Sequence, residues 1–197
     1  MNIKIKNKIN IIPVDNIDNS VLDFIQNSLK RIFKTKIYIL DRIDIPENSF
    51  VKSRKQYNAA IISNYITEKL SLKYIQDINL AILNTDIFVP SLNFVFGIAT
   101  DFPKICLISI LRLNPLFYTF FSLNHKGQDL IEELTDKERK VFKDRILKEA
   151  VHEIGHTLGL NHCNSYKCVM YFSDTLIDTD KKSYNFCPNC LNLLLKE

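Results

Sequence analysis

The pattern of apolar and polar residues along the chain predicts helices and strands in alternation. Apolar residues recur at helical spacing in three segments, which are 21–32, 54–70 and 135–158. Extended apolar or alternating runs mark the expected strands, at 3–12, 36–43, 78–83, 92–99 and 104–113. The run at 78–83 is almost continuously apolar and fits a covered central strand, whereas 3–12 alternates Ile with Lys or Asn and fits a half-exposed one. We therefore expect a mixed α/β fold with a layered, mostly parallel sheet.

Two helix starts carry residues that favour capping. Asp18 or Asn19 can accept hydrogen bonds from the first turn of the first helix. Thr135, with Glu138 three residues later, has the pattern of a capping box and opens the longest helix. A loop is expected before it, at 114–128.

The composition is that of a globular protein. The chain has 197 residues, 46% hydrophobic and 24% charged, which excludes disordered and low-complexity classes. A net charge of +4 with scattered basic residues argues against a nucleic-acid partner. The longest apolar run, at 105–111, is too short to cross a membrane, and the start of the chain lacks the apolar core of a secretory signal. We expect a cytoplasmic monomer with no membrane partner.

Histidines are scarce in this chain and gather at one place. Three of the four fall within eleven residues, and the first two belong to the HExxH sequence His152-Glu153-Ile154-Gly155-His156. On a helix, His152 and His156 lie one turn apart on the same face, so both imidazoles can reach one ion. Glu153 lies beside the pair, where it can hold a metal-bound water.

The third histidine requires a break in the helix. His162 follows His152 by ten residues, which is too far along an uninterrupted helix. Gly159 accepts a positive φ, so it can end the helix and turn the chain back. Three neutral imidazoles then bind Zn²⁺ and leave one position for water, with Glu153 as general base for attack on a peptide carbonyl. The competing interpretation is a structural helix whose histidines are satisfied in the core.

Four of the five cysteines form two pairs near the C-terminus. Cys163 and Cys168 are separated from Cys187 and Cys190 by eighteen residues. Four thiolates around Zn²⁺ make a closed, structural site. Two alternatives are weaker: disulfides need an oxidising compartment, and a redox CxxC motif normally opens a helix of a thioredoxin-like unit. Cys106 lies in an apolar run and is predicted to be a packed core thiol.

These motifs resemble those of the archaemetzincins, a branch of the metzincin metallopeptidases. The resemblance rests on the pattern His152-Glu153-x2-His156-x2-Gly159-x2-His162-Cys163-x4-Cys168-x-Met170, followed by Cys187-x2-Cys190. It implies a metzincin-like zincin fold, with a mixed twisted sheet, a backing helix and a long active-site helix. It also implies a single metallopeptidase domain, with an N-terminal subdomain at 1–159 and a small zinc-stabilised C-terminal subdomain at 160–197.

The resemblance further implies the roles of individual residues. The three histidines hold a catalytic zinc ion, the four cysteines hold a structural one, Glu153 is the general base, and Met170 forms the Met-turn beneath the first ion. In related metallopeptidases the strand above the cleft binds substrate as an added strand, so 92–99 is either such an edge or a core strand. Tyr171 follows Met170 directly and Phe172 comes next, so we assign no oxyanion tyrosine.

Three functions fit the sequence to different degrees. The leading prediction is a zinc-dependent metalloprotease that hydrolyses peptide or protein substrates, with its substrate-binding residues unassigned. The alternative is a catalytically silent zinc protein of the same fold that binds peptides or a partner protein. The presence of Glu153 favours the enzyme. A redox or zinc-ribbon protein using Cys187 and Cys190 would leave the histidines idle.

Overall fold

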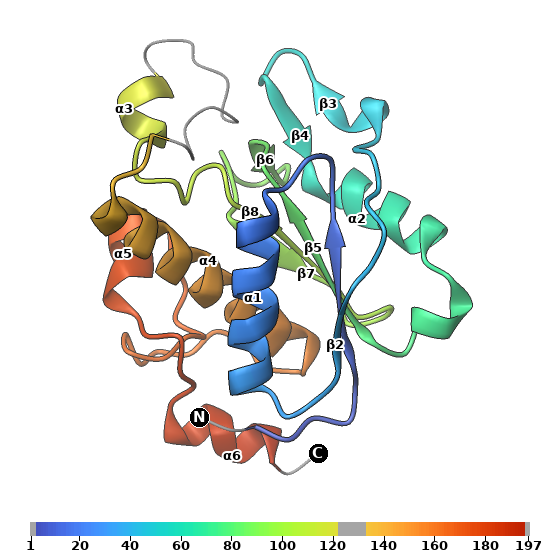
Figure 1. Cartoon of the computed structure of the whole chain (residues 1–197), viewed down its shortest axis with the longest axis vertical. Coiled ribbons are helices and arrows are strands. Elements are labelled where there is room, and N and C mark those ends of the chain that lie inside the picture. The colour runs from blue at the N-terminus through green and yellow to red at the C-terminus, as the bar shows by residue number, and fades with distance from the viewer. Residues whose placement is uncertain (1–2, 122–132, 196–197) are drawn as a thin grey trace.

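A five-stranded sheet with helices on both faces organises the chain (Figure 1). The computed structural model describes residues 3–121 and 133–195. The strands, in spatial order, are β2 (Ile37–Ile39), β1 (Ile9–Pro13), β5 (Ile78–Leu83), β8 (Ile105–Ser109) and β7 (Gly97–Ala99). The first four are parallel, and β7 runs antiparallel to β8 at one edge. This confirms the predicted mixed sheet.

The strand predicted at 3–12 is shorter and more deeply placed than the sequence indicated. It begins at Ile9, and all five residues of β1 are buried because both of its faces are covered. Asn10 remains inside the sheet because its Nδ2 donates to Oδ1 of Asn79 on the neighbouring strand, at 3.1 Å. The prediction of a half-exposed strand was therefore wrong, because the pairing of Asn10 depends on a residue 69 positions away.

Helices α1 (Asn19–Ile32) and α4 (Asp136–Thr157) cover one face of the sheet. The side chain of Asp18 caps α1 by accepting from the Ser20 N–H, as predicted. Thr135 and Glu138 form the predicted capping box of α4, in which each side chain accepts from the other residue's backbone N–H. The bounds of α4 agree with the predicted helix at 135–158 to within one residue.

Helix α2 (Ala59–Lys69) covers the other face. The helix predicted at 54–70 starts later, because Asn58 caps it and the residues before it join a second sheet. That small sheet contains β3 (Phe50–Val51), β4 (Gln56–Asn58) and β6 (Ile87–Phe88), in that order.

The remaining elements are short. They are η1 (Glu47–Ser49), η2 (Leu72–Tyr74), α3 (Phe117–Phe121), α5 (Leu176–Lys181) and α6 (Pro188–Leu194). The loop predicted at 114–128 contains α3, and its part from residue 122 on lies outside the described residues. The strands predicted at 36–43 and 104–113 are confirmed only in their first halves, and the strand predicted at 92–99 only in its last three residues.

A partly buried ion pair ties the segment after α4 back onto that helix. Arg145 of α4 donates from Nε and Nη2 to the two carboxylate oxygens of Asp180 on α5, at 2.7 Å each. Its Nη1 donates to the Leu113 carbonyl at 3.1 Å, so one guanidinium joins three parts of the chain. Among the described helices, none combines the length and apolarity needed to cross a bilayer. The cytoplasmic location and the monomeric state stay predictions.

The central position of β5 generates a stability prediction. Leu80 is fully buried in this strand, and Leu80→Ala is expected to lower the free energy of unfolding by about 2–5 kcal/mol, because it leaves a cavity in the core. Leu72→Ala is the matched control, since Leu72 is 82% exposed, and its effect should stay within about 0.5 kcal/mol. Urea denaturation followed by circular dichroism measures both, and equal effects would contradict this description of the core.

Candidate metal centres

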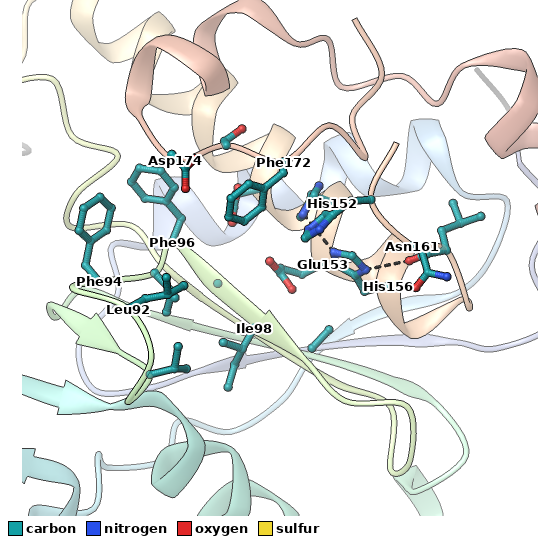
Figure 2. A pocket seen from close by; sticks show the side chains of 18 of the residues that line it. Leu92, Phe94, Phe96, Ile98, His152, Glu153, His156, Asn161, Phe172 and Asp174 are labelled. Atoms are coloured by element: carbon teal, nitrogen blue, oxygen red, sulfur yellow. Dashed lines mark hydrogen bonds between the residues drawn. The ribbon is translucent and has the colours of Figure 1, made fainter. Parts of the chain in front are cut away.

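The two histidines of the HExxH sequence and His162 meet at one point, as predicted. His152 and His156 project from α4, and their Nε2 atoms are 3.1 Å apart (Figure 2). The ring of His162 lies 5.4 Å from that of His152 and 4.8 Å from that of His156, centroid to centroid. One nitrogen from each ring can be chosen so that all three lie within 4.8 Å of one another. This spacing suits three ligands of one small cation.

Backbone carbonyls fix the orientation of two of these rings. The Nδ1 atom of His152 donates to the carbonyl of Val169, and Nδ1 of His156 donates to that of Leu160, both at 2.8 Å. A carbonyl can only accept, so Nδ1 carries the proton and Nε2 presents its lone pair toward the common point. Burial lowers the pKa of all three histidines, which favours the neutral form that binds metals.

His162 reaches this point because α4 ends at Gly159. The Leu160 N–H donates to the carbonyl of Gly155 at 3.0 Å, and the Gly159 N–H donates to that of His156 at 2.9 Å. These are the two hydrogen bonds of a Schellman motif, and Gly159 takes the left-handed position with φ of 86°. The predicted break in the helix is confirmed.

The four paired cysteines form a second cluster. Their sulfur atoms lie within 4.8 Å of one another, with Cys163 and Cys187 Sγ 3.8 Å apart and Cys168 and Cys190 Sγ 3.7 Å apart. These separations are far beyond a disulfide bond of about 2.05 Å, so all four thiols are free. Cys106 is buried in β8, as predicted for a core thiol.

The thiols of this cluster differ in acidity. For Cys187, burial raises the pKa, but hydrogen bonds from the Cys190 backbone N–H and from the neighbouring thiols outweigh it and lower the pKa to about 7. Burial raises the pKa of Cys168 and of Cys190. Four sulfur donors at this spacing fit a tetrahedral metal site, and such a metal binds thiolates in competition with protons.

The two clusters share one loop. The Cys163 N–H donates to the carbonyl of Met170 at 2.9 Å, which closes the loop between them. The carbonyl of Val169 in this loop is the one that orients His152. Met170 is fully buried and packs on α4 so closely that a Cβ at Gly155 would lie 2.4 Å from its Sδ. The loop thus contacts both the histidines and the cysteines.

Glu153 lies next to the histidines in a buried group of charges. Burial raises the pKa of Glu153, and the nearby Glu149 carboxylate raises it further, while Lys182 opposes both effects. The Lys182 Nζ lies 3.9 Å from Oε2 of Glu149 and donates to the carbonyl of Tyr171 at 3.2 Å. Two buried carboxylates beside three imidazole lone pairs suit a bound dication, because its charge would offset theirs.

Sequence reasoning missed three residues around Glu153. Glu149 stands four residues before it on α4, so helical spacing could have indicated the contact. Lys182 and Gly97 come from distant segments, and nothing in their sequence surroundings marks them. A Cβ at Gly97 would lie 2.8 Å from Oε1 of Glu153, so the edge strand β7 passes directly against this carboxylate.

A cavity of about 750 Å³ opens beside the histidines. Figure 2 shows Phe94 and Phe96 to one side of Glu153, with His152 and His156 to its other side. Its walls come from the segment at 89–99, from α4 and from the segment after α4.

The strand β7 forms the last strand of the described sheet beside this cavity. The carbonyl of Phe96 accepts from Ser109, and the Thr100 N–H donates to Ile105, both at 2.8 Å. In an antiparallel ladder the bonded positions alternate, so the main-chain groups of Gly97 and Ala99 face the open edge. This part of the segment predicted at 92–99 is an edge strand.

Two histidines of a long helix converge with a third from the segment after it, beside the edge strand of a mixed sheet. This arrangement defines a zinc metallopeptidase of the metzincin type. The chain matches the model of peptidase family M54 over residues 5–196, and it belongs to this family, the archaemetzincins. The predicted family and enzyme class are confirmed, and the substrates of such an enzyme are peptides.

Individual relatives agree with this assignment over nearly the whole chain. Archaemetzincin from Methanocaldococcus jannaschii is 38% identical over 187 residues, which cover 95% of this chain and 92% of that protein. The crystal structure of archaemetzincin from Archaeoglobus fulgidus, in complex with malonate, has a TM-score of 0.74 at 31% identity, covering 94% of this chain and 99% of that one. A zinc-dependent peptidase from Methanocorpusculum labreanum shares the fold, with a TM-score of 0.77 at 24% identity, over 94% of this chain and 99% of that chain.

The shared loop generates a prediction about metal content. The wild-type chain should carry two metal ions, whereas Cys187→Ser should lose the ion held by the cysteines. We also expect Cys187→Ser to weaken metal binding at the histidines by about tenfold, because the loop that orients His152 is no longer held. Mass spectrometry of bound metal after dialysis, and titration with a competing chelator, measure the two effects.

The control for this experiment is Cys106→Ala, which removes a thiol that belongs to neither cluster. It should keep both ions. A folded Cys187→Ser protein that binds the histidine-site ion with wild-type affinity would contradict the coupling between the two centres.

Proposed function

We propose that the chain hydrolyses peptide bonds in the cavity between β7 and α4, with Glu153 as general base. His152, His156 and His162 would hold the catalytic zinc ion. The observation that carries this proposal is the position of the Glu153 carboxylate, which lies next to the histidines and against the open edge of the sheet at Gly97. When bound by three imidazoles, a zinc ion polarises a carbonyl and lowers the pKa of water.

The edge of β7 supports the binding of an extended peptide. Its free main-chain groups at Gly97 and Ala99 can pair with a substrate strand, which holds the scissile bond by hydrogen bonds independent of side chains. Because Gly97 has no side chain, the Glu153 carboxylate can pack directly against the strand that would bind the peptide. The edge therefore positions the peptide. Glu153 accepts the proton of the attacking water at a carboxylate oxygen.

The four cysteines support a structural zinc site. Tetrahedral sulfur sites are closed to water, and this one would join the loop that contains Cys163 and Cys168 to the start of α6. Residues 160–197 then make up a C-terminal subdomain of one metallopeptidase domain, with Met170 as the Met-turn beneath the histidines. The proposed complement is thus two zinc ions per chain, one catalytic and one structural.

The proposed base is tested by Glu153→Gln. The zinc-loaded wild-type protein should cleave members of a diverse peptide library, and the variant should cleave them at least about 100-fold more slowly, because glutamine cannot accept the proton. Mass spectrometry of the library after incubation identifies the products. Glu68→Gln on the exposed surface of α2 is the matched control and should cleave like wild type. Equal cleavage by Glu153→Gln would contradict the role, and a lack of cleavage by any variant would favour a peptide-binding protein.

The contact between Gly97 and Glu153 gives a second test. In Gly97→Ala the new methyl group would lie 2.8 Å from Oε1 of Glu153, so the carboxylate must move. We expect kcat/KM to fall by about 10- to 100-fold, because displacement of a catalytic group by about 1 Å has effects of this size. Metal content and melting temperature should remain those of the wild type. Full activity of a folded Gly97→Ala protein would show that Glu153 is not held in place by this contact.

A further inference from the structure

The wall of the cavity at residues 92–96 is irregular, yet its main chain is held at several points. We name it the rim segment. Its large apolar side chains, Leu92, Phe94 and Phe96, line the cavity (Figure 2). The Val95 N–H donates to the carbonyl of Ile87 on β6 at 3.0 Å, which anchors the segment to the small sheet.

Two side chains, one from the turn between β3 and β4 and one from the first residue of β4, hold the carbonyls at the start of the rim segment. Arg54 donates from Nη2 to the carbonyls of Leu92 and Asn93, at 3.0 and 2.9 Å. Gln56 donates from Nε2 to the same Asn93 carbonyl at 2.9 Å, and its Oε1 accepts from Nε of Arg54 at 3.0 Å. The two side chains therefore orient each other as well as the rim.

A largely buried ion pair supports this arrangement from behind. Arg112 donates from Nε and Nη2 to the two oxygens of Asp86, at 2.6 and 2.7 Å, and both side chains are less than 15% exposed. Asp86 also accepts from Nε2 of Gln56 at 3.2 Å, which connects the ion pair to the rim carbonyls. Arg54, Gln56, Asp86 and Arg112 thus form one network, which we name the rim bracket.

The same guanidinium contacts the rim through an aromatic ring. The Cζ atom of Arg112 lies 4.2 Å from the centroid of Phe94 and 5.1 Å from that of Phe117. Phe94 in turn packs edge-on against Phe96, with their centroids 5.3 Å apart. The rim bracket therefore fixes both the backbone of the rim segment and the rings that face the cavity.

We propose that Arg112 is a positioning residue that keeps the rim segment preformed as an apolar subsite, which selects substrates with a large apolar side chain next to the reacting bond. The inference rests on the proposed function for the nature of the ligand. Phe172, which is 44% exposed, lines the same cavity and packs against His162 at 4.8 Å between ring centroids. The rim segment and the three histidines thus line the same cavity. A preformed wall binds more tightly because little conformational entropy is lost when the ligand binds.

The test uses inhibitors that report the metal and the subsite separately. Acetohydroxamate serves as a probe for the metal at the histidines. Two dipeptide hydroxamates, identical except for phenylalanine or glycine beside the hydroxamate, serve as probes for the subsite. Isothermal titration of the zinc-loaded wild type should show the phenylalanine probe binding about tenfold or more tightly than the glycine probe, because an aromatic side chain is buried.

Arg112→Gln should remove this preference and leave the metal probe unaffected. We expect the ratio of the two dipeptide affinities to fall to about threefold or less, with acetohydroxamate binding unchanged. Arg112→Lys should restore the ratio only in part, because a lysine lacks the planar fork that holds both oxygens of Asp86. Arg42→Gln is the matched control, since Arg42 is exposed and lies outside the network, and its ratio should equal that of the wild type.

Amide hydrogen exchange of the metal-free protein gives a second readout that needs no ligand. Peptides covering 92–97 should exchange at least about tenfold faster in Arg112→Gln, with the protection of α4 unchanged. If Arg112→Gln does not fold, Gln56→Ala removes one hydrogen bond to the Asn93 carbonyl, and its effects should be smaller and in the same direction.

The possible results separate the two proposals. An unchanged affinity ratio and unchanged exchange in the bracket variants, or no preference for phenylalanine in the wild type, would overturn the inference about the rim. If acetohydroxamate does not bind the zinc-loaded wild type, the proposed function is at fault. In that case only the exchange data test the role of Arg112, and unchanged exchange at 92–97 in Arg112→Gln would overturn that role.

Discussion

The left-handed conformation of Gly159 determines where α4 ends, and the positions of both candidate metal centres follow from it. With a φ of 86°, this residue closes the two hydrogen bonds that turn the chain back along the helix. His162 then meets the two helical histidines, and Cys163 begins the second cluster one residue later. A residue with a side chain would be strained at this φ. The positions of the metal ligands that follow Gly159 therefore depend on its backbone conformation.

The site is held together mainly by main-chain groups. Carbonyls of Val169 and Leu160 set the tautomers of His152 and His156, and the open edge of β7 offers the groups that bind a peptide. Main-chain groups on a packed backbone move less than side chains do. These carbonyls can therefore keep the rings of His152 and His156 in the orientation for binding before a metal is bound. Two arginines stabilise the elements around the site rather than the histidines themselves: Arg145 holds α5 on α4, and Arg112 supports the rim segment.

Local signals in the sequence predicted the parts of the structure that depend on neighbours along the chain. The cap at Asp18, the capping box at Thr135 and the ligand spacing around Gly159 are of this kind, and each is found where it was expected. The errors concern elements decided by distant contacts. The helix predicted from residue 54 begins at Ala59 because the preceding residues pair with β6. The first residues of the segment at 92–99 are held by the side chains of Arg54 and Gln56 rather than by a strand ladder. The contact between Gly97 and Glu153 could not be predicted for the same reason, because it forms only when β7 packs against α4.

The paired amides of Asn10 and Asn79 affect how the parallel strands align during assembly. Most side chains of β1 and β5 are hydrocarbon, and sliding one strand by two residues would keep the same faces buried at little cost. Such a slip would separate the two asparagines and leave the buried Oδ1 of Asn79 without its donor, at a cost of about 1–3 kcal/mol. The pair thereby discriminates against misaligned sheets more than it adds to the stability of the correct one, and it indirectly sets the level at which β8 and β7 meet the helix that carries the histidines.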